Sequence, residues 1–336
     1  MVADGAHGKH EPIPDLRCQP CGHKFTVRRQ TVLYRLKTHS ARVADALTFV
    51  AEGIDVSVLE RVWHIREGTL RTWLTRAGLQ AKKLHARIFQ NLRCAHIQLD
   101  ELWANVRQAS QHVWVWAARD ANTKIVPVLR LGPRTLHLAY AVVHELHHRL
   151  QPGFPLPVFT TDGLRLYFYA LTAHFGHWLQ PEDARKPVWQ IATDFVYGQV
   201  RKFQRRRRLV KVEPVMLWGQ RDTLSQRLKA AGLSGQLNTA FIERLNLTLR
   251  QSIAALTRRS WATAQLTPEL EAHLEWWRAW YHFCRPHQGL RQKRETPQTR
   301  KGQQTARLYR ERTPAMVAGV VDHIWSVEEL LLFPVG

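Results

Sequence analysis

Cysteine is scarce in this chain, with 4 residues among 336. Secreted proteins that depend on disulfides carry a higher density of cysteine, so this composition favours a reducing compartment. The chain also lacks any apolar run of about 18 residues or more, which a transmembrane helix needs. Its first residues lack the basic and then apolar pattern of a secretory signal. We therefore expect a cytoplasmic protein with no membrane partner.

Acidic residues are few relative to basic ones: Asp and Glu number 27, Lys and Arg number 49, and the formal net charge is +22. A surface with this excess of positive charge binds polyanions, and nucleic acid is the usual one. A ribosome-like basic protein is the alternative, but arginine clusters coincide here with DNA-reading patterns, which favours DNA. The hydrophobic fraction of 45% supplies a sizeable core, and the length predicts two or three domains.

Residues 1–38 carry half of a zinc-ribbon pattern. Residues 1–15 are polar and lack periodicity, so we expect a disordered start. Cys18 and Cys21 follow, two residues apart on a turn, and such a pair can share one tetrahedral Zn²⁺ ion. A structural zinc site needs four ligands, and no second cysteine pair is present; His23 is a candidate third ligand. Zn²⁺ binding and a metal-free remnant both remain open.

Residues 39–92 form a predicted helix-turn-helix domain. Apolar residues repeat at helical spacing around residues 46–51, 56–63 and 69–79, with short turns between the three segments. Arg71, Thr72 and Arg76 lie on the outward face of the last helix, where such side chains suit base edges and phosphates. A plain three-helix bundle has the same periodicity.

Residues 93–291 alternate between strand and helix patterns, which predicts a mixed α/β domain. The order of three strands, helix, strand, helix, strand and helix is that of the ribonuclease-H-like fold, although order alone does not exclude other α/β arrangements. The expected strands are 96–103, 112–119, 124–131, 155–162 and 189–200, and the expected helices are 136–150, 164–175 and 238–255. Residues 292–336 are polar and then weakly helical, and we expect a C-terminal tail.

Three acidic residues stand where this fold would bring them together. Asp100 lies within the first strand, Asp162 ends the fourth, and Glu243 lies on the late helix. Carboxylates are hard ligands that suit Mg²⁺ or Mn²⁺, and two such ions about 3.5–4 Å apart promote phosphodiester transfer. A carboxylate in an apolar strand needs a cation or donor, and a plain Asp100–arginine pair is the alternative. Asp-Gly at Asp162 is also a common turn.

Four segments share a pattern with a known family: Arg17–Phe25, Leu99–Trp103, Phe159–Gly163 and Phe241–Gln251. Together with the helix-turn-helix they resemble the insertion sequence one type of DDE transposases, over roughly residues 16–291. That family usually carries two cysteine pairs in its front end, and this chain keeps one.

The resemblance implies an enzyme that cuts the ends of a DNA element and joins the 3′-OH groups to target DNA. It implies that Asp100, Asp162 and Glu243 bind two Mg²⁺ (or Mn²⁺) ions, that double-stranded DNA is the partner, and that the protein is a homo-oligomer. Arg250, seven residues after Glu243, would contact DNA near the cleaved end. A DNA-binding protein of transposase origin that no longer cuts is the alternative.

Two further patterns carry chemistry. Arg205, Arg206, Arg207 and Arg208 form a basic run that we expect to grip DNA phosphates, although a solvated loop has the same composition. The segment His144–His148 fits the H-E-x-x-H pattern of zinc peptidases, but no third ligand is evident downstream.

Overall fold

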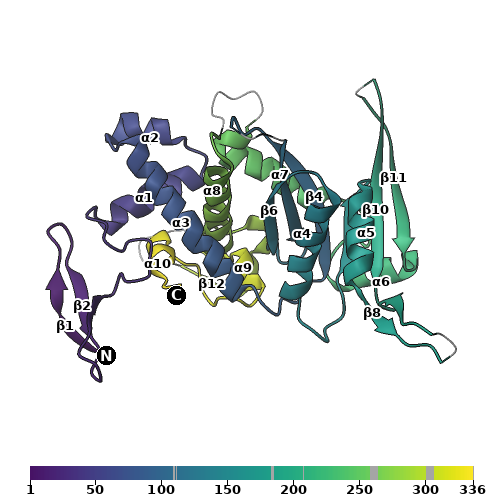
Figure 1. Cartoon of the computed structure of the whole chain (residues 1–336), viewed down its shortest axis with the longest axis horizontal. Helices are drawn as coiled ribbons and strands as arrows, with labels where there is room; N and C mark the ends of the chain where they lie inside the picture. The colour runs from purple at the N-terminus through teal and green to yellow at the C-terminus, as the bar shows by residue number, and fades with distance from the viewer. Residues whose placement is uncertain are drawn as a thin grey trace. The chain divides into compact units, whose positions relative to one another are not determined.

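The structure is a computed structural model that describes residues 1–108, 110, 112–182, 185–206, 208–257, 264–299 and 306–335. The chain divides into two compact units (Figure 1). Unit 1 contains Met1–Ile88, Gln251–Ala262 and Pro268–Gly336, and unit 2 contains Phe89–Arg250 and Thr263–Thr267. None of the described helices combines the length and apolar character needed to cross a membrane.

Unit 2 is built on a mixed sheet of six strands. In sheet order these are β11 (Arg208–Trp218), β10 (Val196–Arg205), β7 (Val158–Asp162), β4 (His96–Ala104), β5 (Val113–Asp120) and β6 (Val128–Gly132). The strands β4, β5 and β6 are antiparallel neighbours, whereas β7 pairs in parallel with both β4 and β10. This mixed sheet fits the expected ribonuclease-H-like core.

Helices cover both faces of this sheet. Alternate side chains of β4 point in opposite directions and contact a helix on each face. Gln98 faces α7 (Ala240–Ser252), where its amide oxygen accepts from the backbone N–H of Ile242 at 2.9 Å. Glu101 faces the other way, toward Tyr167 of α5 (Arg165–His174). The helices α4 (Leu136–Arg149) and α5 pack beside each other, and α6 (Arg221–Ala230) packs near β7.

Arg205, Arg206 and Arg208 of the predicted basic run lie at the turn of a long hairpin. We expected a single strand at 189–200. Instead, β8 (Gly176–Leu179) and β9 (Val188–Ile191) form their own hairpin, and β10 starts at Val196. The strand β10 is buried up to Val200 and exposed from Arg201 onward, where only β11 pairs with it. Figure 1 shows this β10–β11 hairpin projecting from the rest of unit 2.

Unit 1 contains helices where the periodicity predicted them: α1 (Ser40–Ala51), α2 (Val56–Trp63) and α3 (Glu67–Ile88). The Asp55 carboxylate caps α2 by accepting from the N–H of Ser57, and His64 ends it in a left-handed conformation. The helix α8 (Thr267–Ala279) continues into a π-helical turn, Trp280–Cys284, and packs tightly against α3 at Gly78. A 3-10 turn at Ala254–Leu256 precedes α8.

Two expectations for unit 1 differ from the structure. Residues 1–15, which we expected to be disordered, contain β1 (Val2–His7) and the start of β2 (Ile13–Arg17). Together with β3 (Lys24–Thr26) these strands form an antiparallel sheet. Asp4 pairs with both Arg17 and Lys24 across this sheet. Mostly exposed faces explain the lack of apolar alternation in its sequence.

The final residues are part of unit 1 and not the separate tail that we expected after residue 291. A 3-10 turn (Gln288–Leu290) leads into β12 (Gln292–Gln298), β13 (Arg307–Arg310), α9 (Pro314–Val317) and α10 (Val327–Leu332). Leu330 and Leu331 of α10 are buried, and the Trp325 ring stacks on Phe283 with centroids 4.8 Å apart.

Candidate active site

Three carboxylates converge at the end of β7, on the central strands of the sheet in unit 2. Asp100 lies in the middle of β4, and Asp162 is the last residue of β7. The parallel register pairs Leu99 with Thr161, which brings Asp100 and Asp162 level with each other. One carboxylate oxygen from each of Asp100, Glu101 and Asp162 lies within 4.8 Å of the others.

Asp100 is largely buried and depends on neighbouring donors. Its carboxylate accepts from the backbone N–H of Glu101 at 2.9 Å and from the side-chain amide of Asn246 at 2.8 Å. Burial raises the pKa of Asp100 to about 7, and the charges of Asp162 and Glu243 add to this, while the Glu101 N–H and Lys202 oppose it. A carboxylate in this position favours a bound proton or cation.

Glu101 belongs to this cluster although sequence reasoning did not select it. The alternation of β4 directs it away from Asp100, yet both side chains reach the end of β7. It accepts a hydrogen bond from the Tyr167 hydroxyl at 3.3 Å and forms an ion pair with Arg134. Burial raises the pKa of Glu101 to about 8, with further contributions from Asp162 and Asp100. The adjacent acidic pair at 100–101 was the available signal.

Glu243 lies on α7 and is not one of the three converging carboxylates. Its carboxylate forms an ion pair with Lys202 of β10 and accepts from the Thr239 hydroxyl at 2.6 Å. Burial raises the pKa of Glu243, but the Lys202 and Thr239 donors outweigh it and hold the pKa below its ordinary value. The charge of Glu243 still acts on Asp100, so the two side chains share one electrostatic environment.

The residues of this site fit a divalent cation. All the donors are carboxylate oxygens, which Mg²⁺ and Mn²⁺ prefer. Burial is the main cause of the raised pKa values of Asp100 and Glu101, and the repulsion between like charges this close raises them further. A bound cation would relieve that repulsion.

The predicted DNA-contacting residues differ in their surroundings. On α3, Arg71 pairs with Glu67, Thr72 donates to the Gly68 carbonyl at 2.8 Å, and Arg76 donates to the Tyr34 carbonyl at 2.6 Å. All three therefore have partners within unit 1.

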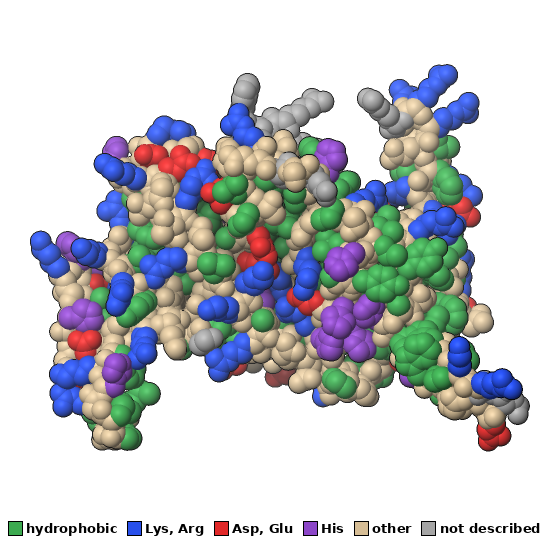
Figure 2. All heavy atoms as spheres, viewed as in Figure 1, with side chains coloured by type: hydrophobic (Ala, Val, Ile, Leu, Met, Phe, Trp, Pro, Cys, Tyr) green, Lys and Arg blue, Asp and Glu red, His purple; other side chains and the backbone are tan. Residues whose placement is uncertain are grey.

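On unit 2, Arg205, Arg206 and Arg208 are exposed at the end of the β10–β11 hairpin, and Figure 2 shows Lys and Arg side chains gathered there. Arg207 lies outside the described residues. Arg250 is partly buried near the end of α7, two turns beyond Glu243.

The cysteine pair lies on a tight turn. The N–H of Gly22 donates to the Cys18 carbonyl at 2.8 Å, and the Cys18 N–H donates to the His23 carbonyl at 2.9 Å. Backbone hydrogen bonding from His23, helped by the Cys18 side chain, lowers the pKa of the Cys21 thiol. Within the described part of the chain, no group of three converging metal ligands includes either cysteine. Zn²⁺ binding here stays a prediction.

The H-E-x-x-H segment lies on α4. The rings of His144 and His148 have centroids 4.4 Å apart. The Glu145 carboxylate, which a zinc peptidase would use as a general base, instead forms ion pairs with Arg130 at 2.5 Å and Arg149 at 2.6 Å. This pairing disfavours the peptidase alternative.

Comparison with known proteins agrees with the acidic site. Residues 236–297 match the family model described as an integrase core domain, and this segment contains Glu243 and Arg250. The match supports a DDE transposase or integrase family. It does not single out the insertion sequence one type. No curated protein matches the chain. Integrase cores of this type act on DNA as metal-dependent nucleases and transferases, which agrees with the carboxylate cluster.

Proposed function

We propose that the chain is a DNA transposase of the insertion sequence one type, which cuts the ends of its element and joins their 3′-OH groups to target DNA. Asp100, Asp162 and Glu243 are the proposed ligands of two Mg²⁺ (or Mn²⁺) ions. The observation that carries this proposal is the convergence of Asp100 and Asp162 beside Glu243 in an integrase-like sheet.

When bound, the metal ions would supply a stronger nucleophile and charge stabilisation at the scissile phosphate. The residues around them would orient the reacting groups. Asn246 holds Asp100 in place through its amide, and Thr239 does the same for Glu243. Glu243 would help to hold an ion in place of its ion pair with Lys202, and the Lys202 ammonium would then be free to bind a phosphate of the DNA.

The proposed DNA partner is double-stranded and contains the terminal inverted repeats and the target. In unit 2, the arginines at the tip of the β10–β11 hairpin and Arg250 are proposed to bind its phosphates. In unit 1, α2 and α3 are proposed to act as a helix-turn-helix, with Arg71, Thr72 and Arg76 at the DNA. Arg71 and Arg76 would then have to exchange their present partners for DNA. Joining two ends calls for a homo-oligomer.

A strand-transfer assay with Mg²⁺ on DNA carrying the inverted repeats that flank the gene tests the proposal. We expect the wild-type chain to cleave and join these ends. Asp100→Asn should lose both activities by at least about a thousandfold while still binding the DNA. Asp222→Asn, at an exposed acid of α6, is the matched control and should remain active.

A DNA-binding protein that no longer cuts is the second candidate. The ion pair between Glu243 and Lys202, in place of convergence with Asp100, favours it. If the wild-type chain and Asp100→Asn bind the ends equally and both fail to cleave, this second function replaces the first.

A further inference from the structure

A cavity of about 790 Å³ lies in unit 1, far along the sequence from the acidic site. Four arginines line it, together with His287 and Tyr309; the arginines are Arg291, Arg294, Arg307 and Arg310. The sequence predicted no binding role for these arginines, because the polar composition of this segment indicates a tail.

The β12–β13 hairpin brings these arginines together. Its antiparallel register pairs Gln292 with Arg310 and Gln298 with Arg307, so the two arginines of β13 lie at opposite ends of the pairing. Arg291 and Arg294 belong to the entry and the first half of β12. The Arg312 guanidinium donates to the Leu290 carbonyl at 2.8 Å, which fixes the base of the hairpin.

The arginines of this cavity have no carboxylate partner among the described residues, although Glu311 is part of the lining. The Arg291 guanidinium stacks on the Tyr309 ring at 4.3 Å. The Nε atom of Arg294 is buried and has no hydrogen-bond partner in the described part of the chain. Positive charges around one cavity repel each other, so the arrangement favours an anionic ligand.

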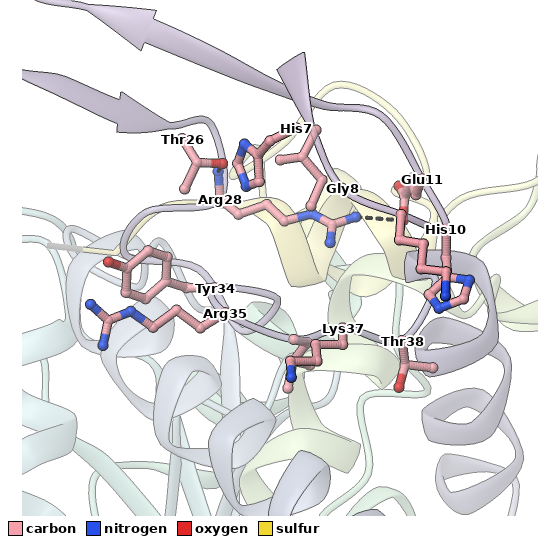
Figure 3. Close-up of a pocket in the computed structure, with 13 residues that line it drawn as sticks. His7, Gly8, His10, Glu11, Thr26, Arg28, Tyr34, Arg35, Lys37 and Thr38 are labelled. Atoms are coloured by element: carbon pink, nitrogen blue, oxygen red, sulfur yellow. Dashed lines mark hydrogen bonds and ion pairs between the residues drawn. The ribbon is translucent and has the colours of Figure 1, made fainter.

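A second cavity of unit 1 provides the contrast. It measures about 680 Å³ and is also lined by basic residues, which include Arg28, Arg35 and Lys37 (Figure 3). There the Arg28 guanidinium pairs with Glu11 at 2.6 Å, and Glu11 also accepts from Ser40. Its buried arginine is thus neutralised from within the protein, whereas the arginines of the β12–β13 cavity are not.

We propose that the β12–β13 cavity binds the phosphodiester backbone of DNA, as a contact surface separate from the catalytic site. Guanidinium groups bind phosphate oxygens in pairs of parallel hydrogen bonds, so four arginines can hold several consecutive phosphates. Such contacts do not read the base sequence, so this surface fits flanking or target DNA as well as an element end. The choice of DNA as the polyanion rests on the proposed function.

Binding to a duplex oligonucleotide without inverted repeats, measured by fluorescence anisotropy in EDTA at several salt concentrations, tests the inference. The test variant is Arg307→Gln/Arg310→Gln, which removes two exposed charges from the cavity. The control is Lys83→Gln/Lys293→Gln, which removes two exposed charges outside it. Thermal melting checks that both variants fold.

We expect weaker binding by the test variant and a salt dependence (log K against log salt) that is shallower by about 1.8, or about 0.9 for each lost phosphate contact. The control should keep a slope close to that of the wild type. Equal slopes for the two variants would overturn the inference. So would binding of inorganic pyrophosphate that the arginine variant loses while its DNA binding is unchanged, because the cavity would then serve a small anion.

The outcome is separable from that of the proposed function. A wild-type chain that binds DNA through this cavity but never cleaves it would contradict the proposed transposase activity and leave the cavity assignment intact. DNA cleavage by a chain whose cavity makes no contribution to DNA binding would instead overturn the cavity assignment and leave the proposed transposase activity intact.

Discussion

The cluster of Asp100, Glu101 and Asp162 is a source of instability in the metal-free protein. Two of the three side chains have pKa values raised to about 7 and about 8, mainly because they are buried. Ionising such groups in the folded state costs free energy that the unfolded chain does not incur. Clustered side chains with strongly shifted pKa values, which reduce the stability of the fold, are typical of functional sites.

We therefore predict that Asp100→Asn stabilises the metal-free protein at pH 8, on the order of 2 kcal/mol, because asparagine carries no charge. The same substitution should reduce the increase in melting temperature that Mn²⁺ gives to the wild type. Thermal melting with EDTA and with Mn²⁺ measures both effects. Glu213→Gln on β11 is the control, and it should change neither value. A loss of stability in the metal-free Asp100→Asn variant would contradict the prediction.

His96 makes the folding stability of unit 2 depend on pH. Burial lowers the pKa of His96 to about 4, helped by the nearby charge of Lys124, and its Nε2 lies 2.8 Å from the Thr160 hydroxyl. The unfolded chain takes up this proton near pH 6.5 and the folded chain does so only near pH 4. Stability is therefore lost as the pH falls through that window.

We predict that His96→Gln weakens this pH dependence between pH 6.5 and 4. One such histidine is expected to lower the free energy of unfolding by at most about 3 kcal/mol at pH 4. Urea unfolding at several pH values, followed by a signal from unit 2, measures it. The exposed His137 supplies the control, since His137→Gln should leave the dependence unchanged.

At the scale of elements, local patterns predicted the parts of the fold that are stabilised by an apolar face. The helices α1, α2 and α3 and the strands β4, β5 and β7 lie where periodicity placed them. The β1–β3 sheet and the β10–β11 hairpin were missed, because cross-strand pairing holds them together without an alternating apolar pattern, helped in the β1–β3 sheet by the ion pairs of Asp4. Cross-strand pairing and ion pairs depend on partner residues that a short segment of sequence does not contain.

The same distinction applies to the candidate site. Asp100 and Asp162 could be predicted because each sits at a recognisable place in a strand. Glu101 could not, because alternation assigns it to the opposite face and only the end of β7 brings it into reach. The Lys202 partner of Glu243 depends on a strand register that the sequence does not reveal.

The contact of α3 with α8 gives a prediction at this scale. A Cβ atom on Gly78 would lie 2.1 Å from the carbonyl oxygen of Ala272, so the two helices can approach only with glycine there. Gly78→Ala should destabilise unit 1 by about 1–3 kcal/mol in spite of the better helix propensity of alanine. Gly68, on the same helix, has open space around it, and Gly68→Ala should be neutral or stabilising. Urea unfolding compares the two variants, and equal effects would contradict this account.

For the whole molecule, the two units do not follow the order of the chain. Unit 1 joins the N-terminal helices to α8 and to everything after it. The indole N–H of Trp276 donates to the Leu47 carbonyl at 2.9 Å, and His85 pairs with Glu275 at 3.2 Å, both in buried surroundings. The predicted boundary between residues 92 and 93, which assigned α8 to the catalytic domain, therefore cuts through a core, since partners about two hundred residues apart leave no local signal.

The last helix, α10, should then stabilise unit 1 and have little effect on unit 2. The Leu331 side chain is fully buried, and its carbonyl accepts from the Val32 N–H at 3.2 Å. We predict that Leu331→Ala costs about 2–5 kcal/mol, because it leaves a cavity in the core. Leu308→Ala, in the same segment at a side chain that is 52% exposed, should cost less than about 0.5 kcal/mol.

Hydrogen–deuterium exchange separates this explanation from a general loss of stability. With Leu331→Ala, amide protection should fall in α1, α3 and α8 and persist in β4 and β7, because the two groups of elements belong to different compact units. A uniform loss of protection across both groups would mean that they unfold together. Unchanged protection in α1 would mean that residues 292–336 are a tail after all, as their polar sequence first indicated.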